Sequence, residues 1–298
     1  MAKQPRNLVG QVAAITGGAR GIGRATAYAL AREGVKVAIG DLDLGVAKAT
    51  AEEVGNGAIA LPLNVTDPDS FSAFVEAVED QLGPLDILIN NAGIMQLGAF
   101  LSEDLKTTRR MIDINIYGVH YGSELALQRF VLRGRGHLIN IASAAGKQGY
   151  AHGATYCGTK HYVVGMSEAL RSELRGTGVE ISCVMPVVVQ TELGSGLPST
   201  RGVKQVEPHD VATEIVSALK EPRFDVFVPR SVAAINTVMQ VVPRRGREAI
   251  GRALKADKVL SGADPSIRAT YELRAQKSGA ELEAAAAAKE LEESSAGS

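Results

Sequence analysis

A tyrosine and a lysine that stand four residues apart, Tyr156 and Lys160 in "YCGTK", could carry acid–base chemistry. A tyrosine hydroxyl ordinarily titrates near pH ~10 and is a poor base in neutral water. Residues i and i+4 share one face of a helix, and an ammonium ~4 Å away at an effective dielectric of ~20 would favour the phenolate by roughly 4 kcal/mol. We therefore expect Lys160 to lower the pKa of Tyr156 and to make it a general acid/base. The alternative from these residues alone is an incidental pair on a surface helix.

Short apolar runs alternate with helix-like segments along the chain. The predicted strands are 12–16, 35–39, 58–63, 86–90, 137–141, 179–184 and 225–228. Apolar residues at three- and four-residue spacing predict helices that include 23–33, 68–82 and 163–176. This alternation predicts an α/β fold with a doubly wound, seven-stranded parallel sheet and helices on both faces. Ligands of such sheets bind outside the carboxyl ends of the strands.

The first predicted strand runs into a glycine-rich turn, "TGGARGIG" at 16–23. Gly17, Gly21 and Gly23 permit a tight turn and a close approach of the backbone to a ligand. The helix that begins near Ile22 would point free N–H groups at a pyrophosphate. This spacing, G-x-x-x-G-x-G, predicts a dinucleotide site because it lies between a strand and a helix.

Asp41 ends the second predicted strand, 18 residues after Gly23. This is close to the ~20-residue offset of a carboxylate that bonds the ribose hydroxyls of a dinucleotide. A carboxylate there would repel a 2′-phosphate, which favours NAD over NADP. Arg20 is the counter-argument, because a cation in the glycine turn could receive that phosphate. Asp43 is a neighbouring candidate for the same role.

Three further motifs follow the later strands. "NNAG" occupies 90–93, "DINIYG" places Asn115 in a predicted helix, and "INIASAAG" places Ser143 after the fifth strand. Together with the glycine turn and "YCGTK", this set resembles the short-chain dehydrogenase/reductase family over residues 8 to 228.

The resemblance implies a role for each residue that matches a family motif. Tyr156 would be the general acid/base, and Lys160 would lower its pKa and bond the nicotinamide ribose. Ser143 would bond the substrate oxygen, and Asn115 would hold a water of a proton relay. For the cofactor, which we expect to be NAD, the implied contacts are Gly17, Arg20, Gly21, Ile22, Gly23, Asp41, Asn64, Val65, Asn91, Ala92, Gly93, Tyr156, Lys160, Pro186, Val189 and Thr191.

The chain departs from the family pattern at three places. Val187 follows Pro186 where the family usually has glycine. Asn64 stands where an aspartate often bonds the adenine amino group, although its amide oxygen could accept the same bond. The finish after the last strand, "FDVFVPRSVAA", replaces the family's usual glycines.

The substrate side is predicted to be apolar. The residues expected to face the substrate are Ile94, Ala145, Gln148, Tyr150 and Val188, and none is a cation. They favour a small lipophilic alcohol or carbonyl compound, such as a steroid, a retinoid or a long-chain compound. Residues 189–208 are rich in Gly, Ser, Pro and Thr, which predicts a mobile lid or an ordinary surface loop.

We expect residues 1–229 to form the catalytic domain, 230–278 a helical extension and 279–298 an Ala/Glu-rich tail that frays. The extension pairs an apolar segment, 231–243, with a basic one, 244–258. Such a pair could lie on an anionic membrane surface. The favoured interpretation is a helical pair that packs over the substrate pocket or a partner subunit.

Composition excludes several classes of function. The net charge of −1 gives no basic field for nucleic acid, and two cysteines and five scattered histidines predict no metal site. No apolar run is typical of a secretory signal or a spanning helix, so we expect a cytoplasmic protein. The family resemblance suggests a homodimer or homotetramer built on the helices that carry Asn115 and Tyr156.

The combined prediction is an NAD-dependent oxidoreductase that interconverts a lipophilic alcohol and its ketone or aldehyde. One alternative is an NADP-dependent ketone reductase. A second is a catalytically silent sensor that binds the cofactor, and a third is an isomerase or dehydratase that uses the same Tyr/Lys pair.

Overall fold

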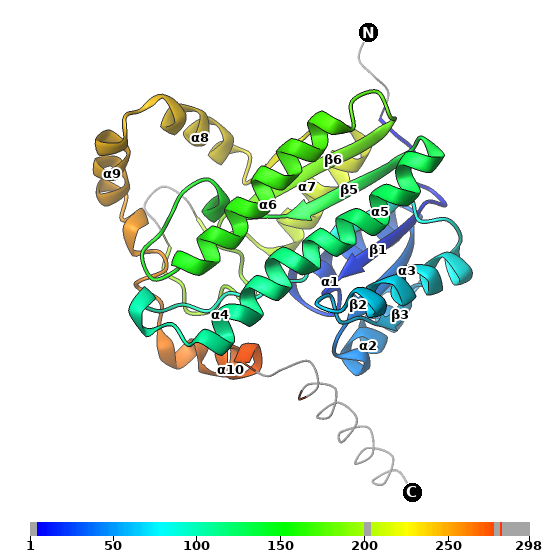
Figure 1. Cartoon of the computed structure of the whole chain (residues 1–298), viewed down its shortest axis with the longest axis horizontal. Coiled ribbons are helices and arrows are strands. Elements are labelled where there is room, and N and C mark those ends of the chain that lie inside the picture. Colours follow the sequence, from blue (N-terminus) through cyan, green and yellow to red (C-terminus); the bar gives the residue numbers. More distant parts are fainter. Residues whose placement is uncertain (1–4, 200–203, 277–280, 282–298) are drawn as a thin grey trace, which may run out of the picture.

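The computed structural model of this chain describes residues 5–199, 204–276 and 281. Its centre is one seven-stranded parallel sheet with helices on both faces, as predicted (Figure 1). The strand order is β3-β2-β1-β4-β5-β6-β7. The strands are β1 (Val12–Thr16), β2 (Lys36–Asp41), β3 (Ile59–Pro62), β4 (Ile87–Asn90), β5 (Gly136–Ile141), β6 (Val179–Pro186) and β7 (Asp225–Val228). The order reverses between β1 and β4, which is where such sheets bind ligands.

Helices cover both faces of the sheet, and each face has its own apolar core. The first core packs the sheet against α1 (Gly21–Arg32), α2 (Leu44–Val54) and α7 (Pro208–Lys220). The second packs it against α3 (Pro68–Leu82), α5 (Val119–Arg133) and α6 (Ala154–Glu173). Successive side chains of a strand point to opposite faces, so Ala13 and Ile15 of β1 enter the first core while Val12 and Ala14 enter the second.

Two helices position the predicted chemistry differently from the sequence pattern. α6 begins at Ala154, nine residues before the predicted helix 163–176, so Tyr156 and Lys160 lie in its first two turns. α4 (Leu105–Ile112) continues into α5 through a π-helical stretch, η2 (Asp113–Gly118), which contains Asn115. A π-helical turn inside a helix re-aims a side chain and often marks a functional site.

The described part of the extension after β7 contains the α-helices α8 (Ser231–Val241), α9 (Arg244–Ala253) and α10 (Pro265–Gln276), with a short 3-10 helix, η4 (Ala256–Lys258), before the last. Figure 1 shows α8 and α9 as an arm that leads away from the sheet, while α10 returns to the body beside α4. Within the described ranges, no helix is both long and apolar enough to span a bilayer. Apart from Glu281, the tail predicted for 279–298 lies outside the described residues.

Candidate active site

A large cavity of about 1110 Å³ lies at the carboxyl ends of the strands. It runs from the glycine turn and the end of β2, past the ends of β4, β5 and β6, to the helices of the extension. All of the predicted catalytic and cofactor-binding residues line it except Gly23 and Asn115. The residues that were scattered along the sequence are therefore brought together.

The glycine turn packs tightly against the segment that follows β4. Gly17 has a φ of +62°, and a Cβ atom there would lie 2.9 Å from Cα of Ala92. The Nδ2 group of Asn91 donates to the carbonyl oxygen of Gly17 at 2.9 Å. Gly23 has a packing role, since a Cβ there would come within 2.4 Å of that same carbonyl oxygen. These contacts bring the first turn of α1 close to the cavity floor.

Asp41 lies beside this turn at the end of β2. Its carboxylate accepts hydrogen bonds from the backbone N–H groups of Ala19 and Asp43, both at 3.1 Å. Burial raises the pKa of Asp41, and the two backbone bonds oppose that rise. Arg20, the cation that could have received a 2′-phosphate, forms an ion pair with Asp43 at 2.7 Å and lies 3.9 Å from Glu192.

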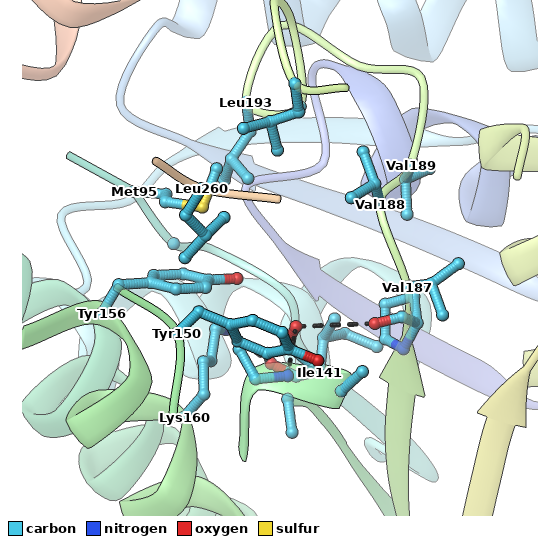
Figure 2. Close-up of a pocket in the computed structure, with 18 of the residues that line it drawn as sticks. Met95, Ile141, Tyr150, Tyr156, Lys160, Val187, Val188, Val189, Leu193 and Leu260 are labelled. Carbon is cyan, nitrogen blue, oxygen red and sulfur yellow. Dashed lines mark hydrogen bonds between the residues drawn. The ribbon is translucent and has the colours of Figure 1, made fainter. Parts of the chain in front are cut away.

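Tyr156, Lys160 and Ser143 line the next part of the cavity, and Figure 2 shows the first two. The Nζ group of Lys160 donates to the carbonyl oxygen of Ile141 at 2.9 Å and lies 5.9 Å from the centroid of the Tyr156 ring. The Ser143 hydroxyl accepts from the N–H of Ala145 at 3.1 Å. Two hydroxyls and an ammonium thus share one wall.

We expected Lys160 to lower the pKa of Tyr156. For the protein without a bound cofactor, this direction is wrong. Burial raises the pKa of Tyr156, while a hydrogen bond with Ser143 and the charge of Arg268 lower it by less. Lys160 is itself buried, and this burial lowers its pKa to about 8. The helical spacing placed the two groups on one face but did not show that this face points into the protein, where desolvation opposes both charges.

Asn115 lies behind this group rather than in the cavity wall. Its Nδ2 group donates to the carbonyl oxygen of Ile94 at 2.9 Å and to Thr159 at 3.1 Å, and its Oδ1 atom accepts from the N–H of Ile94 at 2.9 Å. A Cβ atom on Gly93 would lie 3.2 Å from this Oδ1 and 3.7 Å from Nζ of Lys160. Asn115 therefore ties η2 to α6 and to the segment after β4. The water relay stays a prediction.

Two of the residues that depart from the family pattern form hydrogen bonds with other parts of the chain. The Oδ1 atom of Asn64 accepts two hydrogen bonds from Thr66, at 3.1 Å and 2.7 Å, so the expected acceptor for an adenine amino group is already occupied. The N–H of Val187 donates to the carbonyl oxygen of Val228 at 2.9 Å, which extends the pairing of β6 and β7 by one residue.

The segment after Val187 turns back over the glycine turn. Val189 pairs with Val206 in an isolated bridge, and a Cβ on Gly21 would lie 3.2 Å from Cγ2 of Thr191. Thr191 therefore contacts the same turn that carries Arg20. Part of the loop predicted as a mobile lid, 200–203, lies outside the described residues.

The substrate end of the cavity is mainly apolar. Met95, Leu193 and Leu260 pack in one apolar cluster with Tyr150 and Tyr156, as Figure 2 shows. The five residues predicted to face the substrate all line the cavity, namely Ile94, Ala145, Gln148, Tyr150 and Val188.

Sequence reasoning missed a buried arginine and a buried tyrosine on α10. Arg268 is 1% exposed and donates to the carbonyl oxygens of Met95, Leu193 and Ser195 at 2.9–3.0 Å. The Tyr271 hydroxyl accepts from the N–H of Met95 at 2.8 Å. In the sequence, Arg268 and Glu272 resemble an ordinary i,i+4 surface pair, so no signal distinguished them. These contacts fix the loop at 193–195 to α10.

Beyond the five residues predicted to face the substrate, the cavity lining includes cationic side chains. Arg244, Arg247 and Arg252 of α9 line the same cavity, together with Ile235 and Met239 of α8. The extension therefore forms one side of the pocket, as the favoured interpretation of 231–258 predicted. Among the described side chains, no group of three or more His, Cys, Asp or Glu residues could hold a metal ion.

Comparison with known proteins decides the family. The family model of short chain dehydrogenases matches residues 11–202. The chain belongs to the short-chain dehydrogenase/reductase family. The matched region begins one residue before β1 and ends beyond the Tyr156–Lys160 helix, so α8, α9 and α10 lie outside it.

Three similar proteins illustrate the range of this oxidoreductase family. A sorbitol dehydrogenase of Cereibacter sphaeroides is 38% identical over 191 residues, which are 64% of this chain and 75% of that protein. A 3-alpha-(or 20-beta)-hydroxysteroid dehydrogenase of Mycobacterium bovis is 33% identical over 213 residues, 70% of this chain and 82% of that protein. The structure of a 3-ketoacyl-(acyl-carrier-protein) reductase of Brucella melitensis complexed with NADH has a TM-score of 0.68 and 27% identity, covering 74% of this chain and 97% of the other.

Proposed function

We propose that this short-chain dehydrogenase/reductase is an NAD-dependent oxidoreductase that interconverts a lipophilic alcohol and its ketone or aldehyde. The observation that carries the proposal is the cavity itself. It holds the Tyr156 and Ser143 hydroxyls and the Lys160 ammonium at one point, between an apolar pocket and the glycine turn with Asp41.

The lining fits a dinucleotide that extends from Asp41 to Tyr156. The close approach of Gly17 to Ala92 and the start of α1 after Gly21 give a backbone cradle for a pyrophosphate. Asp41 would bond the adenosine ribose, while Lys160 would bond the nicotinamide ribose and Thr191 the carboxamide. When bound, the nicotinamide supplies the hydride chemistry, and the protein supplies position and charge.

Tyr156 would move the proton of the substrate hydroxyl. As hydride leaves the carbinol carbon, the phenolate oxygen accepts the hydroxyl proton and a carbonyl forms; the reverse reduction returns the same proton. Ser143 would donate to the substrate oxygen and keep it near the tyrosine. When Lys160 and Tyr156 both lie close to the bound ribose, the Lys160 ammonium would favour the phenolate form of Tyr156. A cavity wall that excludes water strengthens each of these contacts.

The charges around the glycine turn favour NAD over NADP. The Asp41 carboxylate is held in place by two backbone donors, and Arg20 is paired with Asp43 rather than free for a 2′-phosphate. The NADH bound to the ketoacyl reductase supports this preference. The apolar substrate end and the hydroxysteroid dehydrogenase relative support a lipophilic substrate.

The deciding experiment measures the absorbance of reduced nicotinamide when the enzyme meets NAD or NADP and a panel of lipophilic alcohols. Tyr156→Phe should abolish a signal seen with NAD, whereas Tyr150→Phe, a second tyrosine in the same cavity, should retain most of it. NAD binding by both variants is measured separately, so that a folding defect is recognised.

The remaining outcomes either contradict the proposal or assign another function to the protein. Full activity in Tyr156→Phe, or turnover of small charged hydroxy acids alone, would contradict the proposal. Silence across the panel with NAD still bound would assign the protein to the sensor class. Rearrangement or dehydration of a substrate without net hydride transfer would assign it to the isomerases or dehydratases.

A further inference from the structure

The helix α8 has an outward apolar face that no described part of the chain covers. Ala234, Val238 and Val241 follow one another at spacings of four and three residues, and Ile235 lies beside them. Such spacing places side chains on one side of a helix. The exposed fractions are 42% for Ile235, 57% for Val238 and 82% for Val241. The opposite side of α8, with Val232 and Met239, faces the second core and the cavity.

The next helix, α9, concentrates positive charge beside this face. It carries Arg244, Arg245, Arg247 and Arg252 against one acid, Glu248, so its formal charge is +3 in a chain whose net charge is −1. In the described part of the chain, Glu248 is ion-paired with Arg244 and with none of the other three arginines. Ile250 and Leu254 add exposed apolar side chains one helical turn apart.

The apolar face and the arginines surround the mouth of the cavity. Ile235 of α8 and Arg247 of α9 belong both to this outer surface and to the cavity lining. Figure 1 shows the two helices as one arm at the edge of the molecule, away from the helices that cover the sheet. A surface that contacts this arm would therefore also lie against the cavity entrance.

We propose that α8 and α9 dock the enzyme on an anionic membrane surface, from which a lipophilic substrate enters the cavity. The apolar face would enter the boundary between headgroups and acyl chains, and the arginines would meet the lipid phosphates. The contact is peripheral, since neither helix is long enough to cross a bilayer. The docking is inferred from the surface of α8 and α9 alone. Only the entry of a lipophilic substrate rests on the function proposed above.

A second copy of the chain fits this surface less well. In a two-fold contact the same patch meets itself, so the α9 helices of both copies, each with a formal charge of +3, would enter one interface. Like charges opposed across an interface are unfavourable. An anionic lipid surface offers an apolar layer and negative charge together.

The test is co-sedimentation of the full chain with phosphatidylcholine vesicles and with vesicles that also contain phosphatidylglycerol. We expect binding to the anionic vesicles, with weaker binding as salt is raised. Val238→Asp combined with Val241→Asp should reduce binding at least about tenfold. Arg245→Glu should reduce it about fivefold or more, because each basic residue near an anionic surface adds about one kcal/mol. None of these three residues lines the cavity.

The matched control is Leu101→Asp, which places the same charge on a leucine that is 97% exposed and lies in η1 (Phe100–Ser102), outside the arm. It should bind vesicles as the native chain does. All variants should keep their activity on a water-soluble alcohol, so that failure of the oxidoreductase assignment is seen separately from failure of docking.

Three results would overturn the docking proposal. The first is a native chain that does not sediment with anionic vesicles. The second is unchanged binding by the variant that combines Val238→Asp with Val241→Asp. The third is a smaller oligomer for that variant without any vesicle binding by the native chain. That result would assign the apolar face to a contact between copies.

Discussion

Two buried titratable groups, Tyr156 and Lys160, line the same cavity, and burial moves their pKa values in opposite directions. The pKa of Tyr156 is raised, and that of Lys160 is lowered to about 8, because desolvation disfavours the charged form of each. The free protein therefore favours the neutral tyrosine more strongly than an exposed pair would. A Tyr156 phenolate can be compensated by the Lys160 ammonium and by Arg268, whose charge lowers the pKa of Tyr156.

Lys160 should make the free energy of unfolding depend on pH. An unfolded lysine titrates near ~10.4, so between about pH 8 and ~10.4 the unfolded chain binds one proton more than the folded chain. The cost of burying the ammonium is fully present below pH ~8 and is lost as the pH rises. Relative to Lys160→Met, the native chain should gain roughly 2 kcal/mol of unfolding free energy between about pH 7 and pH 9.5.

The measurement is denaturant unfolding of both proteins across that pH range without cofactor. Tyrosine and cysteine ionisations are common to both proteins and cancel in the difference. Parallel stability profiles for the two proteins would show that Lys160 is not desolvated in the free enzyme.

Asp41 should set the choice between the two nicotinamide cofactors. Asp41→Ser removes the carboxylate that would repel a 2′-phosphate, so the ratio of kcat/KM with NAD to that with NADP should fall by at least about tenfold, which corresponds to about 1.4 kcal/mol. Asp80→Ser, a change of the same kind on the exposed side of α3, should leave the ratio unchanged. An unchanged ratio for Asp41→Ser would instead make Arg20 the residue to vary.

At the scale of elements, α10 ties together loops that are far apart in the chain. Arg268 joins the segment after β4, through Met95, to the segment after β6, through Leu193 and Ser195. Both segments line the cavity. The helix therefore acts on the shape of the substrate pocket from outside the region matched by the family model.

Arg268→Met should disturb both stability and substrate binding. It removes the charged donors of three buried carbonyl groups, so the free energy of unfolding should fall by roughly 3 kcal/mol. The KM for a lipophilic substrate should rise about tenfold or more because the loops lose their fixed position. Denaturant unfolding and steady-state kinetics measure the two effects.

The control for this prediction is Arg274→Met on the same helix. Arg274 is paired with Glu192, but its side chain is 38% exposed, so the loss should be within about 1 kcal/mol. Arg268→Lys keeps the charge but lacks the planar fork of donors and should lie between the two. Equal effects of Arg268→Met and Arg274→Met would contradict a special role for the buried arginine.

The sequence predicted the sheet well because apolar strands and helical spacing are local patterns. All seven predicted strands overlap the observed ones, and the strand ends carry the motifs that line the cavity. The sequence could not predict that Asn115 lies in a π-helical turn or that the Oδ1 atom of Asn64 accepts its hydrogen bonds from Thr66. Nor could it predict that Arg268 donates to buried carbonyl groups. These depend on which groups lie next to one another after packing, and their residues look ordinary in the chain.

At the scale of the whole molecule, a second apolar surface lies over α4, α5 and α6, which Figure 1 shows together on one face of the sheet. Its exposed large side chains are Leu105, Tyr117, Val131, Leu132 and Tyr162. The rings of Tyr117 and Tyr121 stack with centroids 6.0 Å apart, and His120 bonds the Tyr162 hydroxyl at 3.2 Å, linking α5 to α6. Exposed aromatic side chains such as Tyr117 and Tyr162, joined to this group through Tyr121 and His120, are typical of protein–protein contacts.

This surface should hold the subunits of a homodimer or homotetramer. A two-fold contact buries the same residues on both copies, so one substitution acts twice. Tyr117→Glu should therefore shift the native oligomer to a smaller species in size-exclusion chromatography with light scattering. Val9→Glu, at a residue that is 68% exposed and lies before β1, should leave the mass unchanged.

A monomeric native chain would refute the prediction; an oligomer untouched by Tyr117→Glu would place the contact elsewhere. Because α8 and α9 are not part of this surface, assembly through α4, α5 and α6 would leave the arm of each subunit free for the membrane.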